Sequence, residues 1–266
     1  MDAIRDRLSR LEPAIPWAHH FDLLGVETIT REQNEQFYKK AQAVKSLGRL
    51  ALSYFRTFAD GLPLSSARVL DVASAEGGLS VEFAQAGASE VVGIEGRQLY
   101  VDRANFVIET LGLRNARFLR GDVRKISALE PFDFTIFSGI LHHLGKDDFF
   151  PFLVSLATLT RGTMFLYTHV STPDGVAQFR LVGPVEAEGG FAGSLFREHA
   201  DAATAEQRER QVRASLDNTF SFWATEEALI AALKKAGFNT VAKMFEPHAF
   251  AGYANRNLRV IFIARK

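Results

Sequence analysis

Apolar runs alternate with helical patterns through the middle of the chain. Five runs, most of them rich in Val, Ile, Phe and Leu, have the length of strands that are buried on both faces. They cover residues 67–72, 90–95, 116–122, 132–139 and 162–170. Helical patterns separate most of these runs and lie from Gly77 onward, over 98–111 and over 147–160. Strands that alternate with helices predict a parallel, doubly wound sheet.

The first 65 residues have a different pattern, and we expect residues 1–65 to form an N-terminal helical extension that acts as a lid. A long helix is predicted from about residue 31 to residue 59, because apolar residues recur at helical spacing there. Thr30 and Gln33 have the spacing of a capping box at its start. The simpler alternative is that the apolar stripe of this helix only packs on the core.

The end of the chain completes the predicted sheet. Residues 66–266 are expected to form the main domain, with an insertion after the fifth strand at about 171–222 that is rich in Gly, Ala and charge. A helix follows Thr225, and two late strands, 239–245 and 258–265, are too close together for a helical crossover and predict an antiparallel pair. The predicted fold is a Rossmann-like, doubly wound, seven-stranded α/β sheet, mostly parallel with an antiparallel last strand.

Composition and charge exclude several classes of protein. The chain has 31 basic and 31 acidic residues, so no overall field attracts nucleic acid. It has no cysteine, which excludes disulfides, thiolate chemistry and Cys-based metal sites. The N-terminus lacks an apolar signal segment, and no window has about 18 consecutive apolar residues. We therefore expect a soluble, cytoplasmic protein that does not bind membranes.

The junction between the first strand and its helix is the first candidate site. Residues 69–78, VLDVASAEGG, run from a buried strand through small residues into a helix N-terminus. Such a turn lets a nucleotide-sized ligand approach backbone amides at the carboxyl end of the sheet. Ala73 and Ala75 stand where a dinucleotide motif has glycines, which disfavours a pyrophosphate and therefore NAD.

Two acidic residues follow at the ends of the next strands. Glu95 ends the second predicted strand, where a carboxylate can accept hydrogen bonds from both ribose hydroxyls. Asp122 ends the third, where it could hold an adenine amino group while Val123 packs on the ring. Either acid alone could be a turn or cap residue. A small-residue turn, Glu95, Asp122 and then FSGILHHL in this order indicate one binding site.

In these features the chain resembles the class I S-adenosylmethionine-dependent methyltransferases, over about residues 67–170. The segment D-V-x-S-x-E-G, residues 71–77, looks like the D-I-G-A-x-D-G form of a subgroup that includes the tRNA wobble-uridine carboxymethyltransferases. That subgroup has a Trp and a His before the domain, which Trp17 and His19 or His20 echo. The resemblance implies S-adenosylmethionine as cofactor and S-adenosylhomocysteine as product.

The resemblance also implies roles for individual residues. Asp71 and the backbone of Ala73 would hold the methionine end, Glu95 the ribose, and Asp122 with Val123 the adenine. Ser138 and Gly139 would line the sulfonium. The full set of expected cofactor-binding residues is Asp71, Ala73, Ser74, Gly77, Glu95, Gly96, Asp122, Val123, Ser138 and Gly139.

The acceptor side is predicted from histidines. His142 and His143 follow the fourth strand, and either could be the base or the group that orients the acceptor. They could also only shape the loop. The expected acceptor-binding residues are Trp17, His20, His169, Arg197 and His199. Arg197 could clamp an acidic group or be a solvated surface charge. Adjacent histidines tend to point apart and no carboxylate motif accompanies them, so no metal is expected.

The leading hypothesis is an enzyme that methylates O or N of a small-molecule acceptor, for example in the biosynthesis of a secondary metabolite. The alternatives are a tRNA-modifying methyl- or carboxymethyltransferase, a dehydrogenase on the same topology, and a non-catalytic scaffold with the cofactor fold. Balanced charge near the N-terminus argues against a nucleic-acid partner. The acceptor, the methylated atom and the choice between monomer and homodimer stay open.

Overall fold

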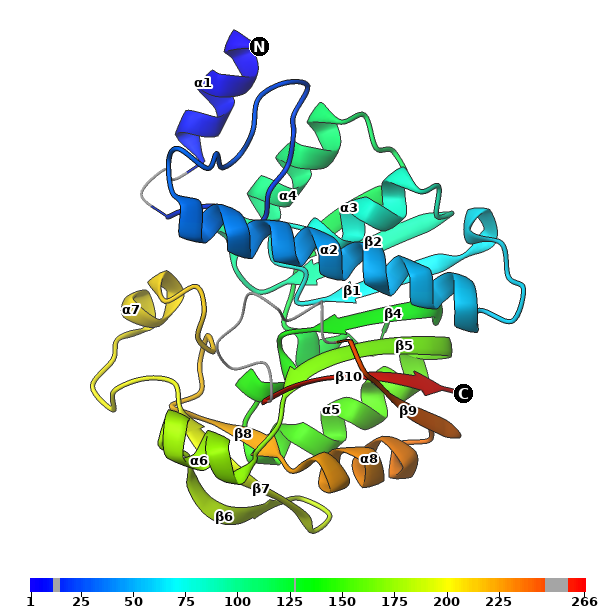
Figure 1. Ribbon diagram of the computed structural model, residues 1–266, viewed down its shortest axis with the longest axis vertical. Helices are drawn as coiled ribbons and strands as arrows, with labels where there is room; N and C mark the ends of the chain where they lie inside the picture. Colours follow the sequence, from blue (N-terminus) through cyan, green and yellow to red (C-terminus); the bar gives the residue numbers. More distant parts are fainter. Residues whose placement is uncertain (12–14, 127, 247–257) are drawn as a thin grey trace. The chain divides into compact units, whose positions relative to one another are not determined.

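Seven strands form one sheet in the computed structural model of the chain, in the order β3-β2-β1-β4-β5-β10-β9 (Figure 1). The structure describes residues 1–11, 15–126, 128–246 and 258–266. The strands are β1 Arg68–Val72, β2 Glu90–Glu95, β3 Ala116–Arg120, β4 Phe132–Ser138, β5 Thr160–His169, β9 Thr240–Met244 and β10 Arg259–Arg265. β2 pairs with β1 and β3 in parallel, and β10 is antiparallel to both β5 and β9. The predicted mostly parallel sheet with an antiparallel last strand is therefore confirmed.

The chain divides into two compact units. Unit 1 holds the described residues within Met1–Val123 and Phe132–Ile136, together with Glu246. Unit 2 holds those within Arg124–Pro131 and Phe137–Phe245, and residues 258–266. These units cut across the expected division at residue 65, so the extension and the insertion stay predictions as domains.

The α-helices that the structure describes in unit 1 are α1 Asp2–Arg10, α2 Glu35–Phe58, α3 Gly78–Gln85 and α4 Gln98–Thr110. The long helix α2 packs along α3 (Figure 1). Trp17, Phe21 and Leu23 lie in one apolar cluster with the buried face of α4. The segment before α2 is thus held on the rest of unit 1 by buried large side chains. Each Å² of apolar surface that they remove from water stabilises the fold by about 25 cal/mol.

The predicted start of the long helix is wrong by one turn. Thr30 and Gln33 do exchange hydrogen bonds, since each backbone amide donates to the other side chain, at 2.9 and 3.3 Å. They close a separate turn, however, and α2 begins at Glu35. Asn34 is its cap, with its side chain accepting a hydrogen bond from the Phe37 amide. The capping-box spacing therefore identified a real turn but not the helix.

Unit 2 contains a second, three-stranded antiparallel sheet that the sequence pattern did not indicate. Its strands are β6 Val182–Ala187, β7 Phe191–Arg197 and β8 Phe220–Ala224, in the order β6-β7-β8. The helices of unit 2 are α5 Lys146–Leu159, α6 Pro173–Phe179, α7 Ala205–Arg210 and α8 Glu226–Lys235. The ring of Phe149 in α5 packs against Phe222 and Phe191 at centroid distances of 5.0 and 6.0 Å. These aromatic contacts attach the small sheet to α5.

Helices α5 and α8 lie side by side against strands of the large sheet in unit 2 (Figure 1). Thr225 caps α8 as predicted, because its side chain accepts a hydrogen bond from the Ala228 amide. Within the described ranges, none of the helices combines the length and the apolar character that crossing a membrane requires.

Candidate functional site

The turn between β1 and α3 adopts a conformation that usually requires glycine. Ala73 and Ala75 have φ angles of 57° and 46°, and Gly77 has a φ of 78°. A left-handed conformation costs a residue with a Cβ roughly 1–2 kcal/mol. The two alanines thus adopt a backbone conformation that glycine takes at less cost. This small-residue turn leads directly into the N-terminus of α3, which favours a negatively charged or hydrogen-bonding ligand.

Glu95 connects this turn to the end of β2. Its carboxylate is buried and accepts hydrogen bonds from the backbone amides of Ala75 and Arg97, each at 2.9 Å. Burial raises the pKa of Glu95, while these amides and the charge of Arg97 oppose that rise. Each carboxylate oxygen can accept a second hydrogen bond. The arrangement fixes Glu95 at the carboxyl ends of β1 and β2 and leaves it able to bind hydroxyl groups.

The ring of Phe118 in β3 packs directly against Gly77 of the turn and Gly93 of β2. A Cβ on Gly93 would lie 2.3 Å from a ring carbon of Phe118, and a Cβ on Gly77 would lie 2.4 Å from another. Both positions therefore exclude a side chain. The Ser74 hydroxyl lies above Gly93, is buried, and has no hydrogen-bond partner among the described residues. An unpartnered buried hydroxyl at a ligand-sized turn is a group that a bound molecule can satisfy.

The remaining predicted cofactor residues of unit 1 surround the same strand ends. Asp71 is buried in β1 and accepts a 2.6 Å hydrogen bond from the Ser80 hydroxyl. Burial raises its pKa to about 7, and the hydrogen bonds from Ser80 oppose that rise. Gly96 follows β2, and Asp122 and Val123 follow β3, half-buried. Their expected roles toward a cofactor stay predictions.

A buried ion pair behind the turn was missed at the sequence level. Glu76 and Arg103 have fully buried side chains and lie 2.7 Å apart. The other carboxylate oxygen of Glu76 accepts hydrogen bonds from the amides of Ala18 and His19, at 2.8 and 2.7 Å. Burial raises the pKa of Glu76 to about 7, against the opposing effect of Arg103 and the two amides. No sequence spacing signals this pair, because its members lie on α4 and in the turn.

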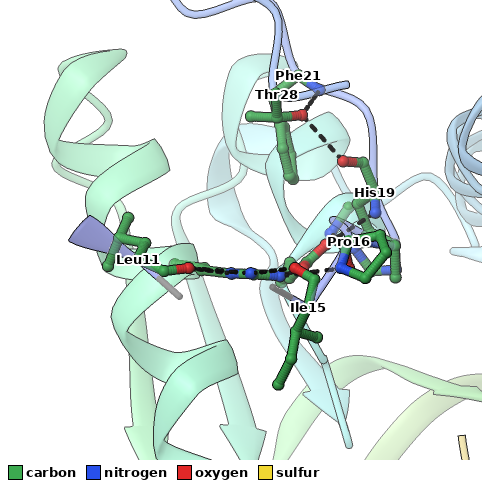
Figure 2. Close-up of polar contacts among 10 residues, drawn as sticks. Leu11, Ile15, Pro16, His19, Phe21 and Thr28 are labelled. Carbon is green, nitrogen blue, oxygen red and sulfur yellow. Dashed lines mark hydrogen bonds and ion pairs between the residues drawn. The ribbon is translucent and has the colours of Figure 1, made fainter. Parts of the chain in front are cut away.

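Arg103 also holds the segment before α2. Its guanidinium donates to the carbonyl oxygens of Leu11 at 2.9 Å and Ile15 at 2.6 Å. Figure 2 shows these carbonyl groups converging on one plane, with Thr28 bridging His19 and Phe21 above them. The N-terminal segment is therefore attached to the cofactor turn through Glu76 and Arg103.

His19 completes this attachment. Its Nδ1 accepts a 2.8 Å hydrogen bond from the amide of Gly78, the first residue of α3. Burial lowers the pKa of His19 to about 4, so the ring is neutral at pH 7 and Nδ1 can accept. A Cβ on Gly78 would lie 2.7 Å from this nitrogen, so the contact requires glycine there.

Two residues that were expected to bind the acceptor, Trp17 and His20, lie in unit 1 near this attachment. Trp17 lies in the apolar cluster on α4 with the guanidinium of Arg103 stacked 4.8 Å from its ring. Trp17 is buried in this cluster, and its expected role in binding the acceptor stays a prediction. His20 is also buried, and its Nε2 contacts Glu27 at 2.9 Å.

Three histidines of unit 2 form a cluster. The rings of His142 and His143 lie 4.3 Å apart, and those of His142 and His169 lie 4.5 Å apart. The expectation that the two adjacent rings point apart is therefore wrong, since their centroids are within contact distance. Trp223 of β8 lies 4.7 Å from the His169 ring, and its indole donates to the His142 carbonyl oxygen.

Burial keeps two of these histidines neutral. The pKa of His142 lies well below its usual value because the ring is buried, and the charges of His143, His169 and Arg259 lower it further. Burial and Arg259 lower the pKa of His169 to about 3. The His143 ring is 18% exposed, and its Nδ1 lies 2.7 Å from Oε1 of Glu198. The described residues hold no group of three or more His, Asp or Glu side chains placed to bind a metal ion.

The other predicted residues of unit 2 have local partners. The ring nitrogens of His199 lie 2.8 Å from the Gln211 side-chain oxygen and 2.7 Å from the Ser215 carbonyl oxygen, and its expected role in binding the acceptor stays a prediction. Arg197 pairs with Asp201 at 2.8 Å and has a half-exposed side chain. Ser138 ends β4, and the amide of Gly139 donates to the Tyr167 carbonyl oxygen.

One protein-family model matches part of the chain. A family model described as "Methyltransferase domain" matches residues 69–162, about a third of the 266 residues. This stretch contains the turn, Glu95, Asp122 and the first two histidines of the cluster. A search of curated proteins found no match.

Solved structures share the fold. The N-terminal domain of EvdMO1 in the presence of SAH and D-fucose has a TM-score of 0.69 and 22% sequence identity, covering 99% of this chain and 96% of that one. The PH0226 protein from Pyrococcus horikoshii OT3 has a TM-score of 0.58 and 16% identity over 87% of this chain and 92% of that one. Magnesium protoporphyrin IX methyltransferase from Synechocystis PCC 6803 with bound SAH has a TM-score of 0.55 and 19% identity over 92% and 91%.

Proposed function

We propose, from the premise that residues 69–162 form a class I S-adenosylmethionine-dependent methyltransferase domain, that the chain methylates an oxygen or nitrogen atom of a small-molecule acceptor. The family model and the sheet order together confirm the predicted methyltransferase and its cofactor. The observation that carries the proposal is Glu95, fixed by two backbone amides at the ends of β1 and β2.

The residues of unit 1 fit the nucleoside and methionine parts of the cofactor. The carboxylate of Glu95 suits two ribose hydroxyls, and the Ser74 hydroxyl is buried without a partner in the described chain. When bound, S-adenosylmethionine supplies an electrophilic methyl group on sulfur. The enzyme's own task is then to align the acceptor and to exclude water.

We place the acceptor against the aromatic cluster of unit 2. The ring of Trp223 has Phe179 and Phe196 at centroid distances of 5.2 Å each and His169 at 4.7 Å. Aromatic surfaces with a few polar groups are typical of small-molecule pockets. D-fucose, which is named with the EvdMO1 domain, is a suitable first acceptor to test, because its apolar face and its hydroxyls match such a surface.

The proposal is tested by thermal shift of the purified chain with four probes: S-adenosylhomocysteine, NADH, a tRNA pool and D-fucose together with S-adenosylhomocysteine. We expect S-adenosylhomocysteine alone to raise the melting temperature and D-fucose to raise it further. Mass spectrometry with S-adenosylmethionine should then detect a methylated sugar. Stabilisation by NADH but not by S-adenosylhomocysteine would overturn the cofactor assignment, and stabilisation by tRNA would overturn the small-molecule acceptor.

A further inference from the structure

A small cavity of about 130 Å³ lies within unit 1, between the segment before α2 and the helices α2 and α3. Residues 19–22 form one wall, and one face of α2 forms a second. The residues of α3 that line the cavity recur every three or four positions, so they share one face of that helix. From Gly78 to Gln85, the cavity therefore follows the whole length of α3.

Small residues on α2 leave the space for this cavity. The two helices are in close contact at Gly48, where a Cβ would lie 3.2 Å from the Cα of Leu79 in α3. Lys45 and Ala41 lie one and two turns before Gly48, on the same face of α2, and both line the cavity. Ala41 is fully buried and has a single side-chain carbon, so it fills little of the space between the helices.

His20 presents a buried nitrogen without a partner. Its side chain is 6% exposed, and its Nε2 lies 2.9 Å from the carboxylate of Glu27. An ionised carboxylate only accepts hydrogen bonds, so Nε2 carries the proton and the lone pair of the neutral ring is on Nδ1. Nδ1 is buried and has no hydrogen-bond partner among the described residues. A bound molecule that donates a hydrogen bond would satisfy this nitrogen.

Lys45 brings a positive charge to the same cavity. Its side chain is half-buried, and its ammonium group has no hydrogen bond or ion pair with any residue that the structure describes. The two carboxylates of the lining already have donors, since Glu82 lies 3.3 Å from Nε of Arg49 and Asp22 accepts a 2.7 Å hydrogen bond from the Gly25 amide. Lys45 is therefore left to attract an acidic group.

We propose that this cavity binds a small hydroxy acid, whose carboxylate contacts Lys45 and whose hydroxyl donates to Nδ1 of His20. A cavity of about 150 Å³ holds benzene, so a molecule of about six non-hydrogen atoms, the size of lactate, fits the present 130 Å³. Asp22 and Gln85 are exposed, so the cavity opens to solvent beside them. The proposal goes beyond the proposed function and does not depend on it.

The cavity is separate from the cofactor turn, although both belong to unit 1. Ser80 does not line the cavity, and its hydroxyl donates to Asp71 of β1 instead. The amide of Gly78 is also engaged, because it donates to Nδ1 of His19. Glu95, at the carboxyl end of β2, is not part of the lining either. We therefore expect lactate and S-adenosylhomocysteine to bind at the same time.

Nitrogen-15 NMR of the histidine rings tests the contact with His20, with L-lactate as the probe. In the free protein we expect the His20 ring to carry its proton on Nε2. Adding lactate should move the Nδ1 signal, because this nitrogen then accepts a hydrogen bond. Propionate, which has the carboxylate but no hydroxyl, should leave the Nδ1 signal near its position in the free protein. An unmoved signal with lactate would overturn the proposal.

Calorimetric titration tests the contact with Lys45. Lys45→Gln should weaken lactate binding roughly 10- to 100-fold, as for the loss of a charge-assisted hydrogen bond. Lys40→Gln is the matched control, because Lys40 lies on the same helix and does not line the cavity. It should bind lactate as the wild type does. Thermal melting of both variants checks that they fold.

A comparison of ligands on the wild type keeps the test independent of any variant's fold. Propionate should bind roughly 3- to 10-fold more weakly than lactate, because it lacks the hydroxyl that donates to Nδ1. Failure of the wild type to bind lactate at millimolar concentrations, or equal affinity for propionate, would overturn the proposal. Displacement of lactate by S-adenosylhomocysteine would also overturn it, because lactate would then occupy the cofactor turn.

Discussion

At the residue scale, the turn of the cofactor site owes its form to backbone conformation more than to residue type. Ala73 and Ala75 adopt positive φ angles, where a Cβ is unfavourable. From the sequence, the two alanines looked like a departure from the family motif. The structure shows the glycine conformation without the glycine residues, which a sequence pattern cannot reveal because it records residue type and not φ.

Replacing these alanines with glycine should therefore stabilise the protein. Ala73→Gly and Ala75→Gly relieve roughly 1–2 kcal/mol of left-handed strain and lose roughly 0.5–1 kcal/mol through the greater freedom of the unfolded chain. We expect a net gain of about 0 to 1.5 kcal/mol for each in urea denaturation. Ala231→Gly, on the exposed face of α8, is the matched control and should destabilise by about 1 kcal/mol. Equal losses in all three variants would contradict this account.

At the element scale, strands that are apolar on both faces were the most predictable part of the fold. β2 occupies Glu90–Glu95, the same residues as the predicted strand. The small sheet was missed because most of β6 is exposed and contains Pro184. In β7, position 193 has to be glycine, since a Cβ there would lie 2.4 Å from the Trp223 carbonyl oxygen. Neither strand therefore shows the alternation that identifies a half-buried strand.

The attachment between the N-terminal segment and the cofactor turn depends on the buried pair of Arg103 and Glu76. Arg103→Ala leaves a buried carboxylate without its partner, so we expect a loss of about 3–5 kcal/mol in the free energy of unfolding. Arg7→Ala is the matched control, because Arg7 pairs with Glu109 on the surface, where both side chains are more than half exposed. It should cost less than about 1 kcal/mol. The free energies of unfolding are measured by chemical denaturation. Similar losses in the two variants would show that the buried pair contributes no more to stability than the surface pair.

At the scale of the whole molecule, the order of motifs along the chain predicted more than any single residue did. The turn at 73–77 follows β1, Glu95 ends β2 and Asp122 lies just beyond β3, and neighbouring parallel strands bring their carboxyl ends to one edge of a sheet. The contacts that sequence reasoning missed join residues far apart in the chain. Glu76 with Arg103 and His143 with Glu198 have no fixed spacing, so only the fold brings them together.

Isothermal titration of S-adenosylhomocysteine into the wild type, Glu95→Gln and Glu130→Ala tests the central claim most directly. Glu95→Gln exchanges one acceptor oxygen for a donor, so we expect binding to weaken about 10- to 100-fold, as for the loss of a charge-assisted hydrogen bond. Glu130→Ala, an exposed carboxylate of unit 2, should bind as the wild type does. Wild-type affinity in Glu95→Gln, or no binding to the wild type, would contradict the account.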